Sequence, residues 1–270
     1  MTTKVSNRIS EVFENRKGDG KIMSLFLTAG YPEIDSTADL ILGFEQNGAD
    51  LIELGMPFSD PLADGPTIQY SSEVALRNGI TMKKIFDIIR KVRETSEIPV
   101  ILMGYINPVL RYGVAEFCRD AALAGADGFI IPDLPAEESG IIEEEARKNG
   151  LYLIFLVAPN TSSERMRMID NKSKGFVYCV SVTGVTGARD GSEVARSVEK
   201  FINRVNKNIK KNPKLVGFGI KNYHDAQLIC KEVDGFIAGS ALIDHIRSNY
   251  PEAKWKNKLF SFVHELKFGN

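Results

Sequence analysis

The sequence predicts an α/β protein of the (β/α)8-barrel class, a TIM barrel with extra helices at its N- and C-terminal ends. Three observations lead to this prediction. Eight short apolar runs recur along the chain, longer amphipathic stretches lie between them, and several runs follow a glycine-containing turn. Because strand and helix patterns alternate, we expect βαβ units and a parallel sheet. An open doubly wound sheet is the alternative, but eight similar units favour the closed barrel.

The eight apolar runs have the character of buried parallel strands. Each is bounded by Gly, Pro or Asp and is mostly continuous rather than alternating, as is typical of strands covered on both faces. The expected strands are Ile22–Leu27, Leu51–Leu54, Val100–Met103, Gly128–Ile131, Tyr152–Val157, Phe176–Val180, Leu215–Phe218 and Phe236–Ala238.

Amphipathic stretches between these runs predict the helices that surround the barrel. They include Ser36–Asn47, Thr81–Glu94, Val114–Ala124, Glu137–Asn149, Ser192–Asn208 and Tyr223–Cys230. The extra helices are expected at Asn7–Asn15 and Glu252–Lys267.

A faint repeat precedes three of the expected strands. Gly48-Ala49-Asp50 stands before the second strand, Gly125-Ala126-Asp127 before the fourth and Asp234-Gly235 before the eighth. A glycine here fits a helix C-cap that leads into a strand. No linker or low-complexity stretch divides the sequence, so we expect residues 1–270 to form a single barrel domain.

The charge balance and the cysteines restrict the possible partners and compartment. The chain has 34 basic and 35 acidic residues, which argues against nucleic acid or an anionic membrane as the main partner. No apolar run approaches the roughly 20 residues of a membrane span. Cys118, Cys179 and Cys230 form no CxxC pair, which is typical of structural thiols in a reducing compartment. We therefore expect a cytoplasmic protein.

Glu53 is an unusual residue for its place in the sequence. It lies inside the apolar run Leu51-Ile-Glu-Leu54, near the end where barrel enzymes place their chemistry. Strand alternation puts it on the same face as Leu51, and an inward carboxyl group would be desolvated. Desolvation raises a carboxyl pKa towards the range useful for proton transfer. The alternative is an outward Glu53 that pairs with a helix.

Glycines after the last two strands point to an anion site. Gly217-Phe218-Gly219 follows the seventh strand, and Gly239-Ser240 follows the eighth and opens a helix. These loops form the usual phosphate site of barrel enzymes, although the glycines could serve tight turns only. The loop 182–191 contains three glycines and two threonines, and it could be a closing lid or an ordinary surface loop.

The run LIELGMPFSDPLADGPTIQ resembles the sequence motif of the tryptophan synthase α family, and the resemblance extends from Phe26 to Ser240. It implies cleavage of indole-3-glycerol phosphate to indole and glyceraldehyde 3-phosphate by a lyase. It also implies that Glu53 and Asp64 are the catalytic pair. From the residues alone, Asp60 and Asp64 could each serve a turn or a helix N-cap.

The same resemblance assigns the binding residues. It places phosphate contacts at Gly187, Gly219, Gly239 and Ser240, with Thr186 on the TGVTG loop. The indole pocket and its supports are Phe26, Tyr105, Asp133 and Tyr178, although Phe26 and Tyr178 could also be core aromatics. Contacts with a β subunit are implied for Pro57, Asp60, Asn107 and Pro108. The expected assembly is α2β2, with pyridoxal phosphate in the β subunit and no cofactor in this chain.

Two other carbon–carbon cleavage mechanisms do not fit the positions of the lysines and histidines. A Schiff-base aldolase needs a lysine near the catalytic end of a strand, but Lys174 and Lys214 stand at strand starts and Lys221 lies beyond the GFGI turn. A metal-dependent enzyme needs clustered ligands, but His224, His245 and His264 lie in late helices, so no metal site is expected. Two functional alternatives are a non-catalytic, ligand-binding regulatory subunit and another phosphate-sugar barrel enzyme.

Overall fold

The computed structural model describes residues 7–269 apart from 17, 19, 181–190 and 218, and leaves aside the side chains of 191–195. Its strands form one parallel sheet in the order β5-β4-β3-β2-β1-β9-β8-β7-β6. The strands are β1 Ile22–Thr28, β2 Leu51–Gly55, β3 Val100–Met103, β4 Gly128–Ile130, β5 Tyr152–Ile154, β6 Leu156–Val157, β7 Val177–Val180, β8 Lys214–Gly217 and β9 Gly235–Ala238.

The nine strands correspond to the eight predicted ones, because β5 and β6 are two pieces of one predicted strand. β5 pairs with β4, and β6 pairs with β7, so the two pieces together close the ring. The break falls at Phe155, whose N–H donates to the Ser173 hydroxyl at 3.3 Å instead of to a neighbouring strand. The predicted barrel is therefore confirmed, with a divided fifth strand.

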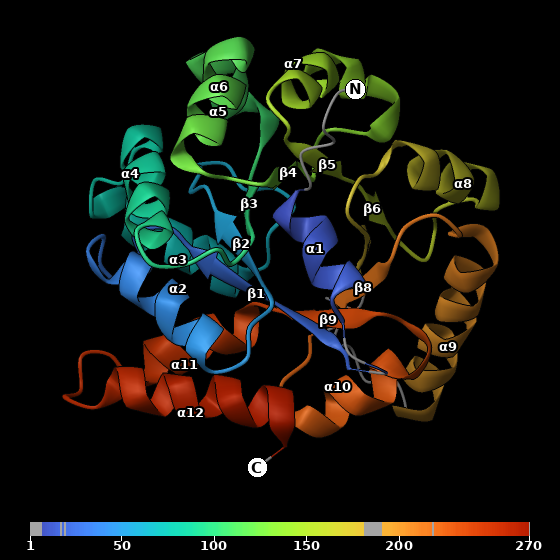
Figure 1. Cartoon of the computed structure of the whole chain (residues 1–270). Helices are drawn as coiled ribbons and strands as arrows, with labels where there is room; N and C mark the ends of the chain where they lie inside the picture. The colour runs from blue at the N-terminus through green and yellow to red at the C-terminus, as the bar shows by residue number, and fades with distance from the viewer. Residues whose placement is uncertain (1–6, 17, 19, 181–190, 218, 270) are drawn as a thin grey trace.

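Helices surround this ring, except for α1 (Arg8–Glu14), which lies across its middle (Figure 1). The others are α2 Ser36–Gln46, α3 Pro66–Arg77, α4 Met82–Arg93, α5 Ile106–Tyr112, α6 Val114–Ala124, α7 Glu143–Lys148, α8 Ser163–Lys172, α9 Gly191–Asn208, α10 Tyr223–Ile229, α11 Ser240–Asn249 and α12 Trp255–Phe268, with 3-10 turns at Ala136–Ile141 and Cys230–Glu232. Within the described part of the chain, no helix is both long enough and apolar enough to cross a membrane.

One predicted helix is divided. The stretch Glu137–Asn149 was expected to be continuous, but it consists of the 3-10 turn Ala136–Ile141 followed by α7. The break is at Ile142, whose φ of −125° leaves the helical range and whose side chain is fully buried. Burial of Ile142 in the core accompanies the bend between the two pieces.

The N-terminal end of the barrel is filled by a cluster of apolar side chains. They come from the inner face of the ring: Ile22, Leu51, Ile101, Ile130, Ile154, Phe176, Leu215 and Ile237. Ile9 of α1 belongs to the same cluster and is fully buried. Figure 1 shows α1 crossing the middle of the ring of strands, so this helix closes the N-terminal mouth.

The aspartates of the faint repeat act alike at this end of the barrel. Each carboxylate accepts the backbone N–H of a residue on the neighbouring strand. The three pairs are Met23 to Asp50 at 2.7 Å, Val100 to Asp127 at 2.8 Å and Lys214 to Asp234 at 2.9 Å. Each aspartate N–H also donates to the carbonyl of the same residue. The repeat therefore joins neighbouring strands at their N-terminal ends.

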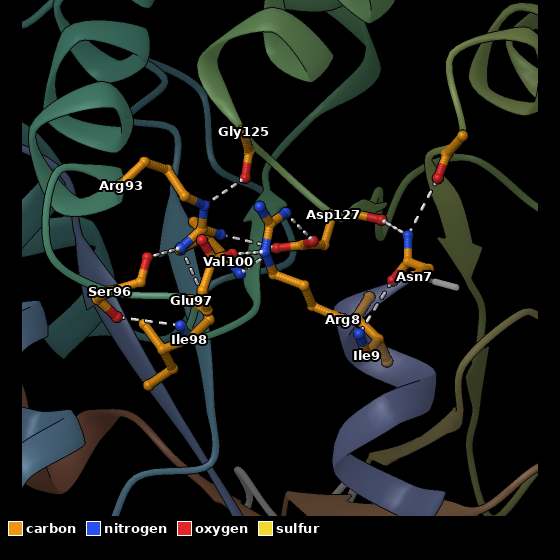
Figure 2. Close-up of polar contacts among 11 residues, drawn as sticks. Asn7, Arg8, Ile9, Arg93, Ser96, Glu97, Ile98, Val100, Gly125 and Asp127 are labelled. Carbon is orange, nitrogen blue, oxygen red and sulfur yellow. Dashed lines mark hydrogen bonds and ion pairs between the residues drawn. The ribbon is translucent and has the colours of Figure 1, made fainter. Parts of the chain in front are cut away.

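Asp127 is the most buried of the three, with 3% of its surface exposed. Arg8 and Arg93 lie within 3.0 Å and 2.9 Å of its carboxylate oxygens, as Figure 2 shows. Asn7 donates to the Asp127 carbonyl at 2.8 Å. Asp127 therefore connects α1, α4 and the start of β4.

We predict that Asp127→Asn lowers the free energy of unfolding by about 3 kcal/mol, because it leaves two arginines without a buried counter-charge. Urea unfolding would measure the loss. The matched control is Asp87→Asn, which removes an exposed pair with Arg90 and should change stability by less than about 1 kcal/mol. Equal effects at the two positions would contradict this account of Asp127.

Candidate active site

Glu53 lies on the inner face of β2, two residues beyond Leu51, and its side chain is fully buried. The Ser24 hydroxyl of β1 donates to Glu53 Oε1 at 2.8 Å. Among the described residues, Glu53 Oε2 has no hydrogen-bond partner. A buried carboxyl oxygen without a partner is costly to retain for packing alone, so this atom is a candidate for contact with a ligand.

Burial has a large effect on the Glu53 carboxyl. Desolvation raises its pKa from 4.5 to about 8, and the hydrogen bond from Ser24 opposes the rise. No cation offsets the loss of hydration among the causes of this shift. Glu53 therefore keeps its proton near neutral pH and can donate it as a general acid.

Asp64 sits on the loop between β2 and α3 and is half-buried. Its N–H donates to the Pro61 carbonyl at 3.1 Å, and its carbonyl accepts from Gln69 Nε2 at 2.8 Å. Burial raises the pKa of Asp64, and a hydrogen bond with Tyr105 opposes that rise. The Tyr105 hydroxyl also accepts the Ala63 N–H at 2.9 Å, so Tyr105 holds the loop on both sides of the Ala63–Asp64 peptide.

Asp133 supports the same arrangement from the next loop. Its Oδ1 accepts the N–H of Ile106, the first residue of α5, at 2.9 Å. Ile106 follows Tyr105 directly, so Asp133 fixes the backbone beside the tyrosine that contacts Asp64. The side chain of Asp133 is itself exposed. Hydrogen bonds thus connect the loop after β4 to the loop after β3, and the loop after β3 to the loop after β2.

Two aromatic rings stand at the C-terminal end of the barrel, where glycines leave room for them. A Cβ on Gly55 would lie 2.6 Å from the Phe26 ring, and one on Gly217 would lie 2.8 Å from the Tyr178 hydroxyl. Both rings are partly buried. Desolvation raises the pKa of Tyr178 well above its usual value, and the nearby Glu53 and Asp64 carboxyls add to the rise. Tyr178 is therefore close to both acids.

The expected phosphate contacts lie around the ends of β8 and β9. Gly219 follows β8 with a φ of +65°, a backbone conformation that favours glycine, and it is exposed. Gly239 caps α11, and Ser240 is the first residue of that helix. The first N–H groups of a helix have no acceptor within it and can bind an anion. Thr186 and Gly187 lie outside the described residues.

The residues expected at a subunit interface fall on neighbouring loops. Asp60 and Asn107 are exposed, and Pro57 and Pro108 are half-buried. Pro57 and Pro108 help to line one cavity of about 350 Å³, together with Met56, Ile80, Thr81, Met82, Ile85, Arg111 and Tyr112. Leu62 beside this region is 95% exposed. The two loops therefore present a largely apolar surface with a hollow between them.

Lys174 lies before β7 and Lys221 lies beyond β8, so both are outside the strands themselves. Lys214 is the first residue of β8, at the opposite end of the barrel from Asp64. His224, His245 and His264 belong to α10, α11 and α12. Across the described ranges, no three His, Cys, Asp or Glu side chains are placed to hold a metal ion.

Sequence reasoning missed Ser24 and Gln69. Ser24 was detectable, because a hydroxyl inside the apolar run Ile22–Leu27 with the same alternation as Phe26 must face the barrel interior. Gln69 had no comparable signal, since its contact with the Asp64 carbonyl depends on how α3 begins.

Comparisons with known proteins identify relatives along nearly the whole chain. Residues 13–268 match the family model described as tryptophan synthase alpha chain. The tryptophan synthase alpha chain of Thermoanaerobacter sp. (strain X514) is 46% identical over 262 residues, which cover 97% of this chain and 98% of the relative. That of Flavobacterium johnsoniae is 45% identical and covers 97% and 100%.

Solved structures agree with these relatives. A crystal structure of the tryptophan synthase alpha chain from Legionella pneumophila superposes with a TM-score of 0.86 at 37% identity, covering 97% of both chains. A chain of tryptophan synthase from M. tuberculosis in an open form with BRD0059 bound gives 0.85 at 31% identity, covering 98% of both.

We predict that Glu53→Gln removes a pH dependence of stability. The folded chain holds the Glu53 proton up to a pKa of about 8, whereas the unfolded chain releases it near 4.5, so the parent loses stability as pH rises between these values. The variant should gain on the order of 3 kcal/mol over the parent at pH 8 and little at pH 4.5.

Urea unfolding across this pH range measures the difference in the free energy of unfolding. Glu73→Gln on the exposed face of α3 is the control and should show no such trend. A difference between Glu53→Gln and the parent that stays constant with pH would contradict the raised pKa.

Proposed function

The chain belongs to the tryptophan synthase alpha chain family, and we propose that Glu53 and Asp64 carry out the acid–base chemistry of its reaction. That reaction is the lyase cleavage of indole-3-glycerol phosphate to indole and glyceraldehyde 3-phosphate. One observation carries the proposal: Glu53 is buried in the barrel, its pKa is raised to about 8, and one of its oxygens has no partner among the described residues.

The reaction is a retro-aldol cleavage in which the leaving fragment has no carbonyl group. Protonated Glu53 first donates its proton to C3 of the indole ring, which gives an indolenine that can accept electrons. The bond between C3 and the glycerol C3′ then breaks, and its electron pair returns to the ring. The C3′ hydroxyl becomes the aldehyde and gives its proton to the Glu53 carboxylate, which restores the acid.

Asp64 has the complementary role. Its carboxylate accepts a hydrogen bond from the indole N–H and favours the positive charge of the indolenine. Tyr105 and Gln69 hold Asp64 from its side chain and its carbonyl, respectively. Two carboxyl groups with different surroundings can thus take the acid and the charge-stabilising roles at one pH.

Binding energy comes from both ends of the substrate. The aromatic rings of Phe26 and Tyr178 flank the indole, and Asp133 supports Tyr105 through the start of α5. Backbone N–H groups near Gly219, Gly239 and Ser240 hold the phosphate, which fixes the position of the reacting carbon. The family resemblance assigns further substrate contacts to Thr186 and Gly187, which lie outside the described residues.

The partner is a β subunit that binds pyridoxal phosphate, in an α2β2 assembly that transfers indole between the two sites. Pro57, Asp60, Asn107 and Pro108 contribute the contact surface, supported by the exposed apolar residues and the hollow between their loops. This chain needs no cofactor for the steps above. Its three buried free cysteines support a reducing, cytoplasmic location.

We predict that the purified chain releases indole from indole-3-glycerol phosphate and that a β subunit increases the rate. Glu53→Gln should lower kcat by at least about a thousandfold, because a glutamine side chain cannot supply the proton that the indole C3 receives. Asp64→Asn should lower kcat by about a hundredfold, because one charge-stabilising contact weakens. Glu73→Gln on the exposed face of α3 should match the parent.

Spectroscopic indole release with each variant measures these effects. Activity retained in Glu53→Gln would show that another group is the acid. A parent chain that binds substrate but stays inactive with the β subunit would favour the non-catalytic regulatory role.

A further inference from the structure

Helices α3 and α11 carry the two halves of the proposed site at their N-terminal ends. α3 begins at Pro66, two residues after Asp64, and α11 begins at the phosphate residue Ser240. The two helices pack against each other, and both contact β1. Their relative placement therefore sets the separation between Asp64 and the phosphate site.

Two side-chain contacts join the helices along this line. The Thr67 hydroxyl of α3 donates to Asp244 Oδ1 of α11 at 3.1 Å. One turn further along, the Arg247 guanidinium of α11 lies 4.2 Å from the centroid of the Tyr70 ring of α3. Thr67 and Tyr70 are three residues apart and therefore lie on one face of α3. Asp244 and Arg247 have the same spacing and lie on one face of α11. We call these four residues the α3–α11 seam.

On the inner side of the seam, Tyr70 packs against a buried aromatic ring. The buried Tyr31 ring, 3% exposed, packs edge-on against Tyr70 with ring centroids 6.1 Å apart. Arg247 is the outer layer of this stack, since it lies over the Tyr70 ring and is itself exposed. A guanidinium above an aromatic face is attracted to it even at an exposed site.

The first turn of α3 is joined directly to Asp64 by a hydrogen bond. Thr67 lies in the first turn of α3, and Gln69 in the same turn donates from its side chain to the Asp64 carbonyl at 2.8 Å. The Gln69 backbone N–H donates to the Gly65 carbonyl at 3.0 Å. The first turn of α3 and Asp64 therefore move together.

We propose that the α3–α11 seam positions Asp64 relative to the phosphate site, which makes Thr67 and Arg247 positioning residues for the cleavage reaction. The inference rests on the proposed roles of Asp64 and of the start of α11. A bound phosphate fixes α11, and the seam places Asp64 at the indole nitrogen. Loss of the seam reduces turnover while leaving substrate binding in place, because small errors of placement weaken contacts made in the transition state.

The test compares Thr67→Val, which keeps the shape but removes the hydroxyl, with Thr67→Ser, which keeps the donor. Thr67→Val should lower kcat for indole-3-glycerol phosphate about fivefold and leave KM within about twofold. Thr67→Ser should restore kcat. Arg247→Met should behave like Thr67→Val, and Arg247→Lys should retain more of the activity. The control Glu73→Gln lies on α3 outside the seam and should be unchanged.

A second readout separates positioning from general damage. Inhibition by inorganic phosphate should be equal in the parent and Thr67→Val, because the start of α11 stays intact. In the Asp64→Asn background, measured by single turnover with excess enzyme, Thr67→Val should cause no further loss, since the two act through one contact.

Three results would contradict the positioning role of the seam. The first is an unchanged kcat in Thr67→Val, and the second is a Thr67→Ser variant as impaired as Thr67→Val. The third is a further loss of kcat of about fivefold when Thr67→Val is added to Asp64→Asn. If one of these results is obtained while Asp64→Asn alone is impaired, the seam proposal fails but the proposed function stands. Full activity of Asp64→Asn itself would instead overturn the role of Asp64.

Discussion

Closure of a parallel sheet into a barrel removes inward-facing side chains from water on all sides, and the chemistry of Glu53 depends on this constraint. Leu51 and Glu53 share the inner face of β2, because alternate residues of a strand point the same way. Leu51 packs in the apolar layer above α1, and Glu53 lies one step nearer the open end with Ser24 as its partner. The topology thus provides a carboxyl group that stays protonated at neutral pH.

The two ends of the barrel surround their buried carboxyl groups with different partners. At the N-terminal end, Asp127 is held by the guanidinium groups of Arg8 and Arg93 and joins secondary-structure elements. Burial raises the pKa of Asp127, and the Val100 N–H and both arginines oppose that rise, which suits a stabilising role. At the C-terminal end, desolvation and the Ser24 hydrogen bond are the causes of the Glu53 pKa shift, with no cation among them in the described part of the chain, and Asp64 is held by Tyr105. The contacts at the N-terminal end therefore stabilise the barrel, and the loops at the C-terminal end form the site.

Local sequence patterns predicted most of the fold, because buried parallel strands and amphipathic helices have distinct periods. They did not predict the break at Phe155, which follows from a hydrogen bond to Ser173, far along the chain. For the site, alternation placed Glu53 on the same face as Leu51 but left an outward orientation open, and only family resemblance distinguished Asp64 from Asp60. The contacts that hold Asp64, such as those of Tyr105, join separate loops, and no local pattern carries that information.

The most direct test of the central claim is the titration of the Glu53 carboxyl group in the free chain. Carbon-13 NMR of glutamate side-chain carboxyls would follow each signal with pH, and Glu53→Gln would identify the signal of Glu53. We expect this signal to titrate at a pKa of about 8, and we expect Ser24→Ala to move the midpoint higher by removing the hydrogen bond that opposes the rise. A Glu53 signal that titrates near the ordinary value of 4.5 would show that burial does not raise the pKa of this carboxyl group.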